Sequence, residues 1–327
     1  DITAWTSTDF LRVETDSGDG IIRGLKSGLD SLYIWKDSSI WRLSGTNKDD
    51  FRLERMIQGI GTLSNASISI VNNPTTNEQL FFFVTQYGDV AVYDGGITVT
   101  IISHKVSNSI PNSLNLNRLD EVVSTSYDFH YVISVSRSGV ATHDRLYLFD
   151  VVHQAWTRFS GITANALGTF EDSSGQTDLM FGDYSGRVNA WDITDTTTLT
   201  DPSTTAINAY IQTGWRAFSE LGNEKRLRAM KIFANQEGVS RVLDVEVRKD
   251  FEDSGTTYSV SLAGSGATWD TAIWDTSKYA DLTVTISRIE PDAGDNAFLI
   301  RFSNGTRAAD NFRLRKIQYF LEASGRV

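Results

Sequence analysis

The stretch that decides the fold runs from Leu80 to Gly96. It reads Leu80-Phe81-Phe82-Phe83-Val84, then Tyr87-Gly88-Asp89, then Val90-Ala91-Val92-Tyr93-Asp94-Gly95-Gly96. A short, continuously apolar run bounded by turn residues predicts a strand that is buried on both faces. Gly and Asp after each run predict tight turns. The stretch therefore predicts an antiparallel hairpin inside a β-rich core.

The same strand–turn–strand pattern recurs along the first 195 residues. Its first strands start near 32, 80, 131 and 179, a spacing of about 50 residues. A period of this size predicts β-propeller blades of about four strands. A meandering β-sandwich with coincidental hairpins is the alternative. Four units are few for a closed ring, so we expect either blades upstream of Asp1 or closure by another part of the chain.

The sequence pattern changes after residue 195, where the repeated hairpins end. We expect a propeller-like domain over 1–195, a polar linker over 196–205 and an antiparallel β-sandwich-like domain over 206–327. In the last of these, Leu243, Val245 and Val247 alternate with polar residues, which predicts one buried strand face. Helical patterns are nearly absent, and the best candidate is the short segment 110–120. The predicted fold class is all-β.

Composition excludes several classes of protein. The chain has 327 residues, no cysteine and a formal net charge of −11. The lack of cysteine excludes disulfide scaffolds and thiolate metal sites. Residues 1–200 hold 14 Lys+Arg against 24 Asp+Glu, which gives −10. We do not expect such a chain to bind nucleic acid tightly, because tight binding requires clustered Lys and Arg residues. No apolar run reaches the roughly 20 residues of a membrane helix, so no membrane span is expected.

A search for chemistry finds no catalytic fingerprint. The four histidines lack metal-ligand spacing, and no nucleophile elbow or phosphate-binding loop occurs. The segments 16–20 and 292–296 could supply oxygen ligands to Ca²⁺, but turn chemistry explains their Asp and Gly residues equally well. We therefore predict no catalytic residue, no cofactor and no metal site, and expect that the protein is not an enzyme.

Two basic clusters stand out in the second half of the chain. They comprise Lys225, Arg226 and Arg228, and Arg313, Arg315 and Lys316. One interpretation is cross-strand pairing with acidic residues of the same domain. The other is docking between subunits, onto an acidic neighbour such as the propeller-like domain of another copy.

The sequence resembles tail proteins of short-tailed bacteriophages in the order of its characteristic stretches. The resemblance rests on stretches spread over most of the chain: Trp5, Asp9-Phe10, Asp19-Gly20-Ile21-Ile22-Arg23-Gly24-Leu25, 32–45, Gly61-Thr62, 80–96, 101–106, Gln212-Thr213-Gly214-Trp215, 225–228, 243–250 and 317–326. The similar families are the tail nozzle proteins and the packaged-DNA stabilisation, or tail plug, proteins.

This resemblance implies a virion structural protein that retains packaged DNA and forms the conduit for genome ejection. It implies a homo-oligomeric ring of six copies that contacts adaptor or portal-side proteins and tail fibre or needle proteins. DNA would pass only transiently and without specificity, and an acidic wall would repel it. The protein would be made in the host cytoplasm and reside in the virion tail.

A propeller-type tail protein that binds or cleaves glycans is the alternative function. Its pocket acids would come from Asp89, Asp94, Asp183 or Asp192, because glycoside hydrolysis uses a pair of carboxyl groups. A third hypothesis is glycan or receptor binding through exposed aromatics such as Trp269 and Trp274, for which packing of a loop onto the sandwich is the alternative.

Overall fold

The computed structural model describes residues 11–13, 18–47, 50–191, 208–218, 224–235, 242–262, 284–305 and 312–323. The chain divides into two compact units, 1–192 and 193–327. The linker expected over 196–205, together with Trp269 and Trp274, lies outside the described residues.

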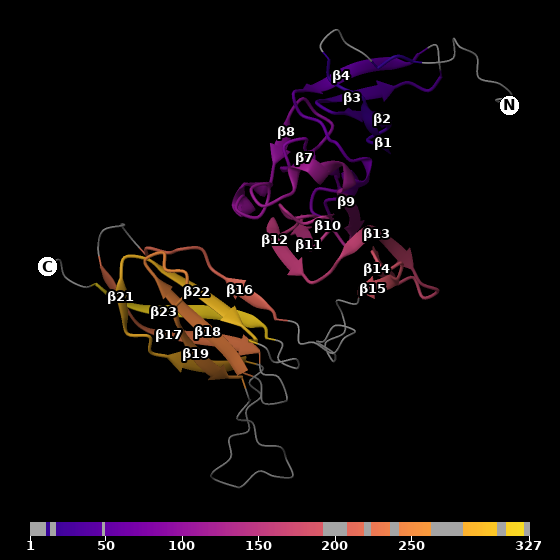
Figure 1. Cartoon of the computed structure of the whole chain (residues 1–327). Helices are drawn as coiled ribbons and strands as arrows, with labels where there is room; N and C mark the ends of the chain where they lie inside the picture. Colours follow the sequence, from indigo (N-terminus) through magenta and orange to yellow (C-terminus); the bar gives the residue numbers. More distant parts are fainter. Residues whose placement is uncertain are drawn as a thin grey trace. The chain divides into compact units, whose positions relative to one another are not determined.

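Unit 1 consists of four antiparallel sheets in chain order (Figure 1). The first sheet contains β1 (Ile22–Gly28), β2 (Ser31–Lys36), β3 (Ser39–Ser44) and β4 (Arg52–Gln58). The second contains β5 (Ser69–Asn72), β6 (Gln79–Val84), β7 (Val90–Tyr93) and β8 (Val99–Ile101). The third contains β9 (Val123–Tyr127), β10 (His130–Val135), β11 (Arg145–Asp150) and β12 (Ala155–Ser160). The fourth contains β13 (Ala164–Glu171), β14 (Thr177–Asp183) and β15 (Val188–Trp191).

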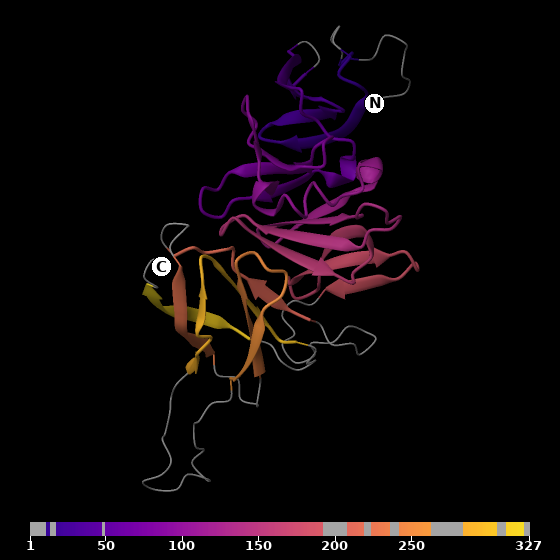
Figure 2. The same cartoon turned by 60° about the vertical axis from the view of Figure 1, so that its left-hand side comes forward.

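Each sheet is a simple meander in which consecutive strands pair. The first strands of the second, third and fourth sheets lie against one another, since β9 packs against both β5 and β13. Successive sheets follow one another through unit 1, from indigo to rose in Figure 2. These are the features of propeller blades, so the predicted all-β, propeller-like class is confirmed.

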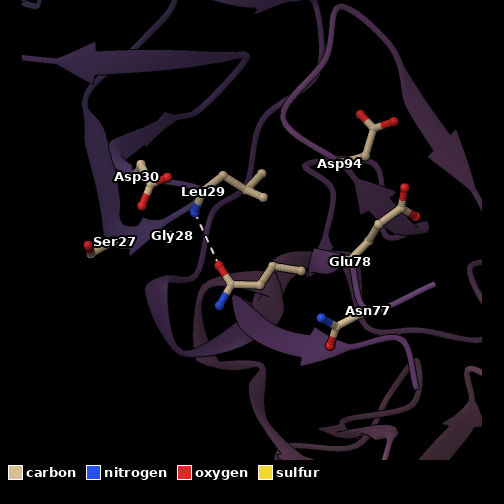
Figure 3. Close-up of a pocket in the computed structure, with 8 residues that line it drawn as sticks. Ser27, Gly28, Leu29, Asp30, Asn77, Glu78 and Asp94 are labelled. Carbon is tan, nitrogen blue, oxygen red and sulfur yellow. Dashed lines mark hydrogen bonds between the residues drawn. The ribbon is translucent and has the colours of Figure 1, made fainter. Parts of the chain in front are cut away.

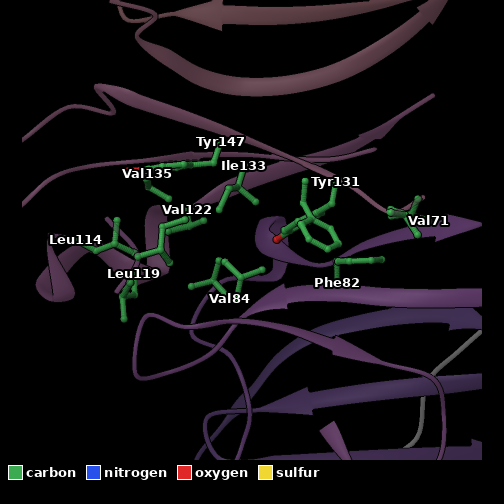
Figure 4. Packing of buried hydrophobic residues seen from close by; sticks show 14 residues of the cluster. Val71, Phe82, Val84, Leu114, Leu119, Val122, Tyr131, Ile133, Val135 and Tyr147 are labelled. Carbon is green, nitrogen blue, oxygen red and sulfur yellow. The ribbon is translucent and has the colours of Figure 1, made fainter. Parts of the chain in front are cut away.

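Alternation along the second strand of a blade explains why these strands are continuously apolar. In β6, Phe81 and Phe83 are buried against the first sheet, whereas Phe82 and Val84 are buried against the third. Successive side chains point to opposite faces of a strand, so a sheet covered on both sides needs apolar residues at every position. Figure 4 shows the contact between the second and third sheets, where Phe82 stacks on Tyr131 with ring centroids 5.2 Å apart.

One local prediction is wrong. The segment 110–120 does not form a helix that begins at Ile110; instead, the Ile110–Pro111 peptide bond is cis, and a 3₁₀ segment (Leu116–Glu121) follows. Proline cannot continue a helical hydrogen-bond ladder, and Asn115 caps the later segment by accepting from the backbone N–H of Asn117. Two other 3₁₀ turns are Asn65–Ser67 and Ser103–Val106. Among the described residues, no helix is long and apolar enough to cross a membrane.

Unit 2 is built from two antiparallel sheets around one core. One sheet has the order β16 (Tyr210–Gln212), β22 (Phe298–Ser303), β18 (Val242–Lys249) and β19 (Thr256–Ser261). The other has β20 (Val284–Ile289), β17 (Lys225–Asn235) and β21 (Ala293–Asp295), and β23 (Leu314–Ala323) also pairs with β17. Leu243, Val245 and Val247 are buried in the core, as their alternation predicts. The sandwich-like part of the predicted fold class is thus confirmed as well.

Candidate functional site

An open pocket lies where the first two blades of unit 1 meet. Its volume is about 800 Å³, and it is lined by Ser27, Gly28, Leu29, Asp30, Asn77, Glu78, Gln79 and Asp94 (Figure 3). These residues come from the turn between β1 and β2, the loop that leads into β6, and the end of β7. The pocket therefore collects three carboxyl groups and two side-chain amides from adjacent blades.

Local turn geometry positions the first wall. Leu29 and Asp30 form the two-residue connection between β1 and β2, with φ of 48° and 55°. Two successive residues at positive φ are typical of a tight hairpin turn, which leaves the Asp30 side chain exposed. The backbone N–H of Leu29 donates to Oε1 of Gln79 at 3.1 Å, the dashed line in Figure 3. That hydrogen bond joins the two walls of the pocket.

The second wall rests on a folded loop before β6. The backbone N–H of Asn77 donates to the carbonyl of Asn73 at 2.7 Å, and that of Asn73 donates to the carbonyl of Glu78 at 2.9 Å. Asn77 itself has φ of 57°. The loop thereby projects Asn77 and Glu78 as exposed polar side chains at the rim.

Asp94 is fixed at the third side by the turn that follows β7. Its Oδ1 accepts the backbone N–H of Gly96 at 2.9 Å, and the Tyr93 hydroxyl donates to the carbonyl of Gly96 at 2.9 Å. Burial raises the pKa of Tyr93 well above its usual value, so this hydroxyl stays a donor. In the view of Figure 3, Glu78 and Asp94 lie on one side of the pocket and Asp30 on the other.

Gly95 lets the two blades approach closely at this point. It has φ of 86°, and a Cβ there would lie 2.6 Å from Cδ1 of Leu29 and 2.7 Å from the Tyr33 hydroxyl. Any side chain there would therefore force Leu29 or Tyr33 to shift. The glycine predicted only as a turn residue thus also permits this close approach of the two blades.

The carboxyl groups surround the pocket without converging on one point. Among the described residues, no group of three or more His, Cys, Asp or Glu side chains is placed to hold a metal ion. Carboxylates and amides spread around an open pocket instead suit a ligand with many hydroxyl groups, each of which both donates and accepts hydrogen bonds.

The other acids named for the glycan-cleaving alternative lie elsewhere. Asp89 accepts from the Ser103 hydroxyl at 2.8 Å, and Asp183 accepts the backbone N–H groups of Ser185 and Arg187 at 2.8 and 2.9 Å. These are turn-stabilising contacts, and the bonds lower the pKa of Asp183. Asp192 lies outside the described residues. Of the four named acids, Asp94 alone is among the residues that line this pocket.

The segments weighed as calcium loops have other contacts. Asp19 is buried and forms an ion pair with Lys36, with 2.9 Å between Oδ1 and Nζ. Asp292 pairs with Arg226 at 2.6 Å. Asp16 lies outside the described residues.

The six basic residues predicted for docking have varied surroundings. Lys225 is buried. Arg226 and Arg228 form ion pairs with Asp292 and Glu322 within the same unit. Such pairs match the cross-strand interpretation for these two arginines. The remaining three lie on β23 or just before it and are exposed: Arg313, Arg315 and Lys316. Docking between subunits stays a prediction.

Comparisons with known proteins give structural neighbours only. No family model and no curated protein matches the sequence. One solved structure with a similar chain course is a glycoside hydrolase family 43 arabinoxylan arabinofuranohydrolase from Bacillus subtilis, in complex with cellotetraose. It has 9% identity, a TM-score of 0.28 and coverage of 91% of this chain and 78% of that one.

Two further neighbours are glycan-cleaving enzymes by description. An exo-β-1,3-galactanase from Phanerochaete chrysosporium, with galactose, has 11% identity, a TM-score of 0.22 and coverage of 94% of this chain and 98% of that one. A third structure, described as a glycoside hydrolase, has 10% identity, a TM-score of 0.28 and coverage of 90% and 83%.

These neighbours contradict the sequence-based prediction that the chain is not an enzyme, and that prediction is withdrawn. With TM-scores of 0.28 or less and identities of 9–11%, these neighbours carry no argument about the substrate, the mechanism or any residue of this chain. The chemistry of the pocket is therefore argued from this chain alone.

Proposed function

We propose that this protein binds a glycan in the pocket between its first two blades and cleaves a glycosidic bond there. The observation that carries the proposal is the gathering of Asp30, Glu78 and Asp94 with the amides of Asn77 and Gln79 around one open volume. Hydrolysis of a glycosidic bond uses two carboxyl groups on either side of the bond, and hydroxyl-binding amides position the sugar.

The surroundings of the carboxyl groups suggest their roles. The bond from the backbone N–H of Gly96 holds the Asp94 carboxyl group in place at the pocket, so we assign Asp94 as the base or nucleophile. We assign Glu78 as the general acid, with the scissile bond of the bound sugar lying between the carboxyl groups of Glu78 and Asp94. Asp30, across the pocket, is assigned to hold sugar hydroxyl groups.

The experiment measures release of reducing ends from a panel of α- and β-linked oligosaccharides of glucose, galactose, xylose and arabinose. The variants are Glu78→Gln and Asp94→Asn. The matched control is Asp150→Asn, because Asp150 ends β11 of the third blade as Asp94 follows β7 of the second, and it accepts the N–H groups of Val152 and His153. Each pocket variant is expected to lose about 100-fold or more in rate, as is usual when a general acid or base is removed.

A placement of this activity in a bacteriophage tail remains our second proposal. Its support is the resemblance of the sequence stretches to tail nozzle and tail plug proteins, together with the strongly acidic first 200 residues. The six-copy ring, the adaptor, portal-side and fibre or needle contacts, and the virion location belong to this proposal. Imaging of particles that carry a tagged copy tests it: label at the tail vertex supports the placement, and label absent from particles refutes it.

A further inference from the structure

Unit 2 carries a pair of aromatic rings outside its core. Trp215 and Phe251 lie with ring centroids 4.8 Å apart and planes tilted by 44°. Neither residue belongs to the core cluster of the sandwich, and Phe251 is 64% exposed. Phe251 thus presents an exposed ring that packs on the half-buried Trp215, and we call this pair the platform.

Phe251 is held in place by its neighbour. The Asp250 carboxylate accepts the backbone N–H groups of Asn296 and Ala297, each at 3.0 Å, and the Asn296 amide at 3.3 Å. The backbone N–H of Asp250 also donates to the carbonyl of Ala297 at 3.0 Å. These four bonds fix the backbone from which Phe251 projects, so its exposed position is built rather than accidental.

Trp215 is anchored to Phe298, which directly follows Ala297 in the chain. Its neighbour Arg216 exchanges two backbone hydrogen bonds with Phe298, at 2.9 and 3.0 Å. The backbone next to each ring is therefore held by hydrogen bonds to the segment 296–298. The platform exists before any ligand arrives, and little conformational entropy is lost on binding.

Polar side chains lie close to the Asp250–Phe251 turn. The Asp295 carboxyl group interacts with that of Asp250, and burial together with this contact raises the pKa of Asp295. The Nζ of Lys249 is 3.5 Å from Oδ2 of Asp295. Arg216 follows Trp215 in the chain and is exposed. A pyranose has an apolar C–H face that stacks on aromatic rings and hydroxyl groups that hydrogen-bond to polar side chains of these kinds.

We propose that the Trp215–Phe251 platform is a second glycan-binding site, which stacks a neutral pyranose on its rings and hydrogen-bonds the sugar hydroxyls through Asp295, Lys249 and Arg216. The site does not depend on the pocket of unit 1, and its occupant need not be cleaved. Together, the two sites would let the chain hold a polysaccharide at one place and act on it at another.

The chain supplies a matched control for this platform. Asp128 and Phe129 form the turn between β9 and β10, with φ of 41° and 61°, close to the 35° and 67° of Asp250 and Phe251. Phe129 is 46% exposed, and within the described part of the chain it has no aromatic partner. Phe129→Ala therefore removes an exposed ring from an equivalent Asp-Phe turn but leaves the platform intact.

The test uses the full chain in an Asp30→Asn, Asp94→Asn background, in which the first change weakens sugar binding in the unit 1 pocket and the second prevents cleavage. Binding of the same oligosaccharide panel is followed by calorimetry and by saturation transfer from protein to sugar C–H protons. We expect at least one member to bind, with affinity reduced about tenfold by Phe251→Ala and unchanged by Phe129→Ala.

Two outcomes overturn the proposal: no member of the panel binds in this background, or Phe251→Ala binds as tightly as its parent. Because Phe251 is exposed, its truncation leaves the core unchanged, and the circular dichroism spectrum checks this. Loss of hydrolysis in the pocket variants is scored separately, so failure of one site is distinguishable from failure of the other.

Discussion

Removing one partner of the buried ion pair between Asp19 and Lys36 is expected to destabilise the first blade strongly. Both side chains are nearly inaccessible, at 6% and 5% exposure, and the Asp19 carboxylate also accepts from the Ser39 hydroxyl at 2.7 Å and from Trp41 Nε1 at 3.3 Å. Lys36 donates a second bond to the carbonyl of Val13 at 3.1 Å. The cluster thus ties the segment before β1 to β2 and β3.

The perturbation is Asp19→Asn. It preserves shape and a hydrogen-bond acceptor but leaves the Lys36 ammonium buried beside a neutral group. Removing one partner of a buried pair costs about 3–5 kcal/mol, because the remaining charge has lost its compensation. The retained acceptor places the expected cost at the lower end, about 3 kcal/mol.

The matched control is Glu54→Gln in the same sheet. Glu54 pairs with Arg42 at 2.6 Å, but these side chains are 39% and 33% exposed. A solvent-exposed pair contributes about 0–1 kcal/mol, so this variant should change stability by less than about 1 kcal/mol. Both substitutions convert a carboxylate to an amide, and burial is the main difference between them.

The pH dependence of stability gives an independent estimate of the free energy that the Asp19 carboxylate contributes to the fold. Burial alone would raise the pKa of Asp19, but hydrogen bonds from Ser39, Lys36 and Trp41 outweigh it and lower the pKa from 3.8 to about 2. A folded-state pKa below the unfolded one stabilises the fold above the unfolded pKa, and this contribution is lost as pH falls through 3.8 toward 2. The shift corresponds to about 2 kcal/mol.

The assay is hydrogen exchange measured by mass spectrometry on peptides from β2 and β3, with urea titration, because the two units of the chain need not unfold together. The opening free energy of these peptides should fall by about 3 kcal/mol in Asp19→Asn and by less than about 1 kcal/mol in Glu54→Gln. Equal effects of the two variants would refute the reasoning, as would a wild-type opening free energy that is unchanged between pH 5 and pH 2.

Three further predictions concern the contacts between blades. Gly95→Ala should destabilise unit 1 by about 2–3 kcal/mol, because the new side chain is both strained and overpacked. Gly186 has a similar φ of 79°, but a Cβ there would meet nothing within 4 Å, so Gly186→Ala should cost only about 1 kcal/mol. The urea midpoints of the two variants are compared. Phe82→Ala should cost about 3–5 kcal/mol, because it leaves a cavity between the second and third blades; an unaltered midpoint would place Phe82 outside the core. Burial lowers the pKa of His143, so the unfolded chain takes up a proton first and the stability of unit 1 should fall as pH drops below 6.5; His143→Gln should flatten this dependence, and an identical slope in both proteins would exclude His143 as its source.

The sequence predicts the middle of each blade far better than its first strand. The strands β2, β6, β10 and β14 begin at 31, 79, 130 and 177, so the repeat was found from the second strands. These strands are covered on both faces and therefore read as apolar runs. The strand β9, Val123–Tyr127, has three Ser or Thr residues among its five and gives no such pattern. Its pairing with β10, not its own composition, makes it a strand.

The pocket could be predicted only in part, for a related reason. Asp94 was a candidate because it ends an apolar hairpin, but Asp30 and Glu78 sit in turns whose residues are typical of any solvated loop. Their proximity depends on the packing of one blade against the next, 50 residues away in the chain. The Trp215–Phe251 platform was missed in the same way, since the two residues meet only through the strand that contains Phe298.

The most direct test of the central claim is hydrolysis of the oligosaccharide panel by the intact chain and its pocket variants. The account predicts that the wild type releases reducing ends from at least one member. Glu78→Gln and Asp94→Asn should reduce that rate by about 100-fold or more, while Asp150→Asn leaves it unchanged. No release from any member, or equal rates in the wild type and both pocket variants, would contradict the account.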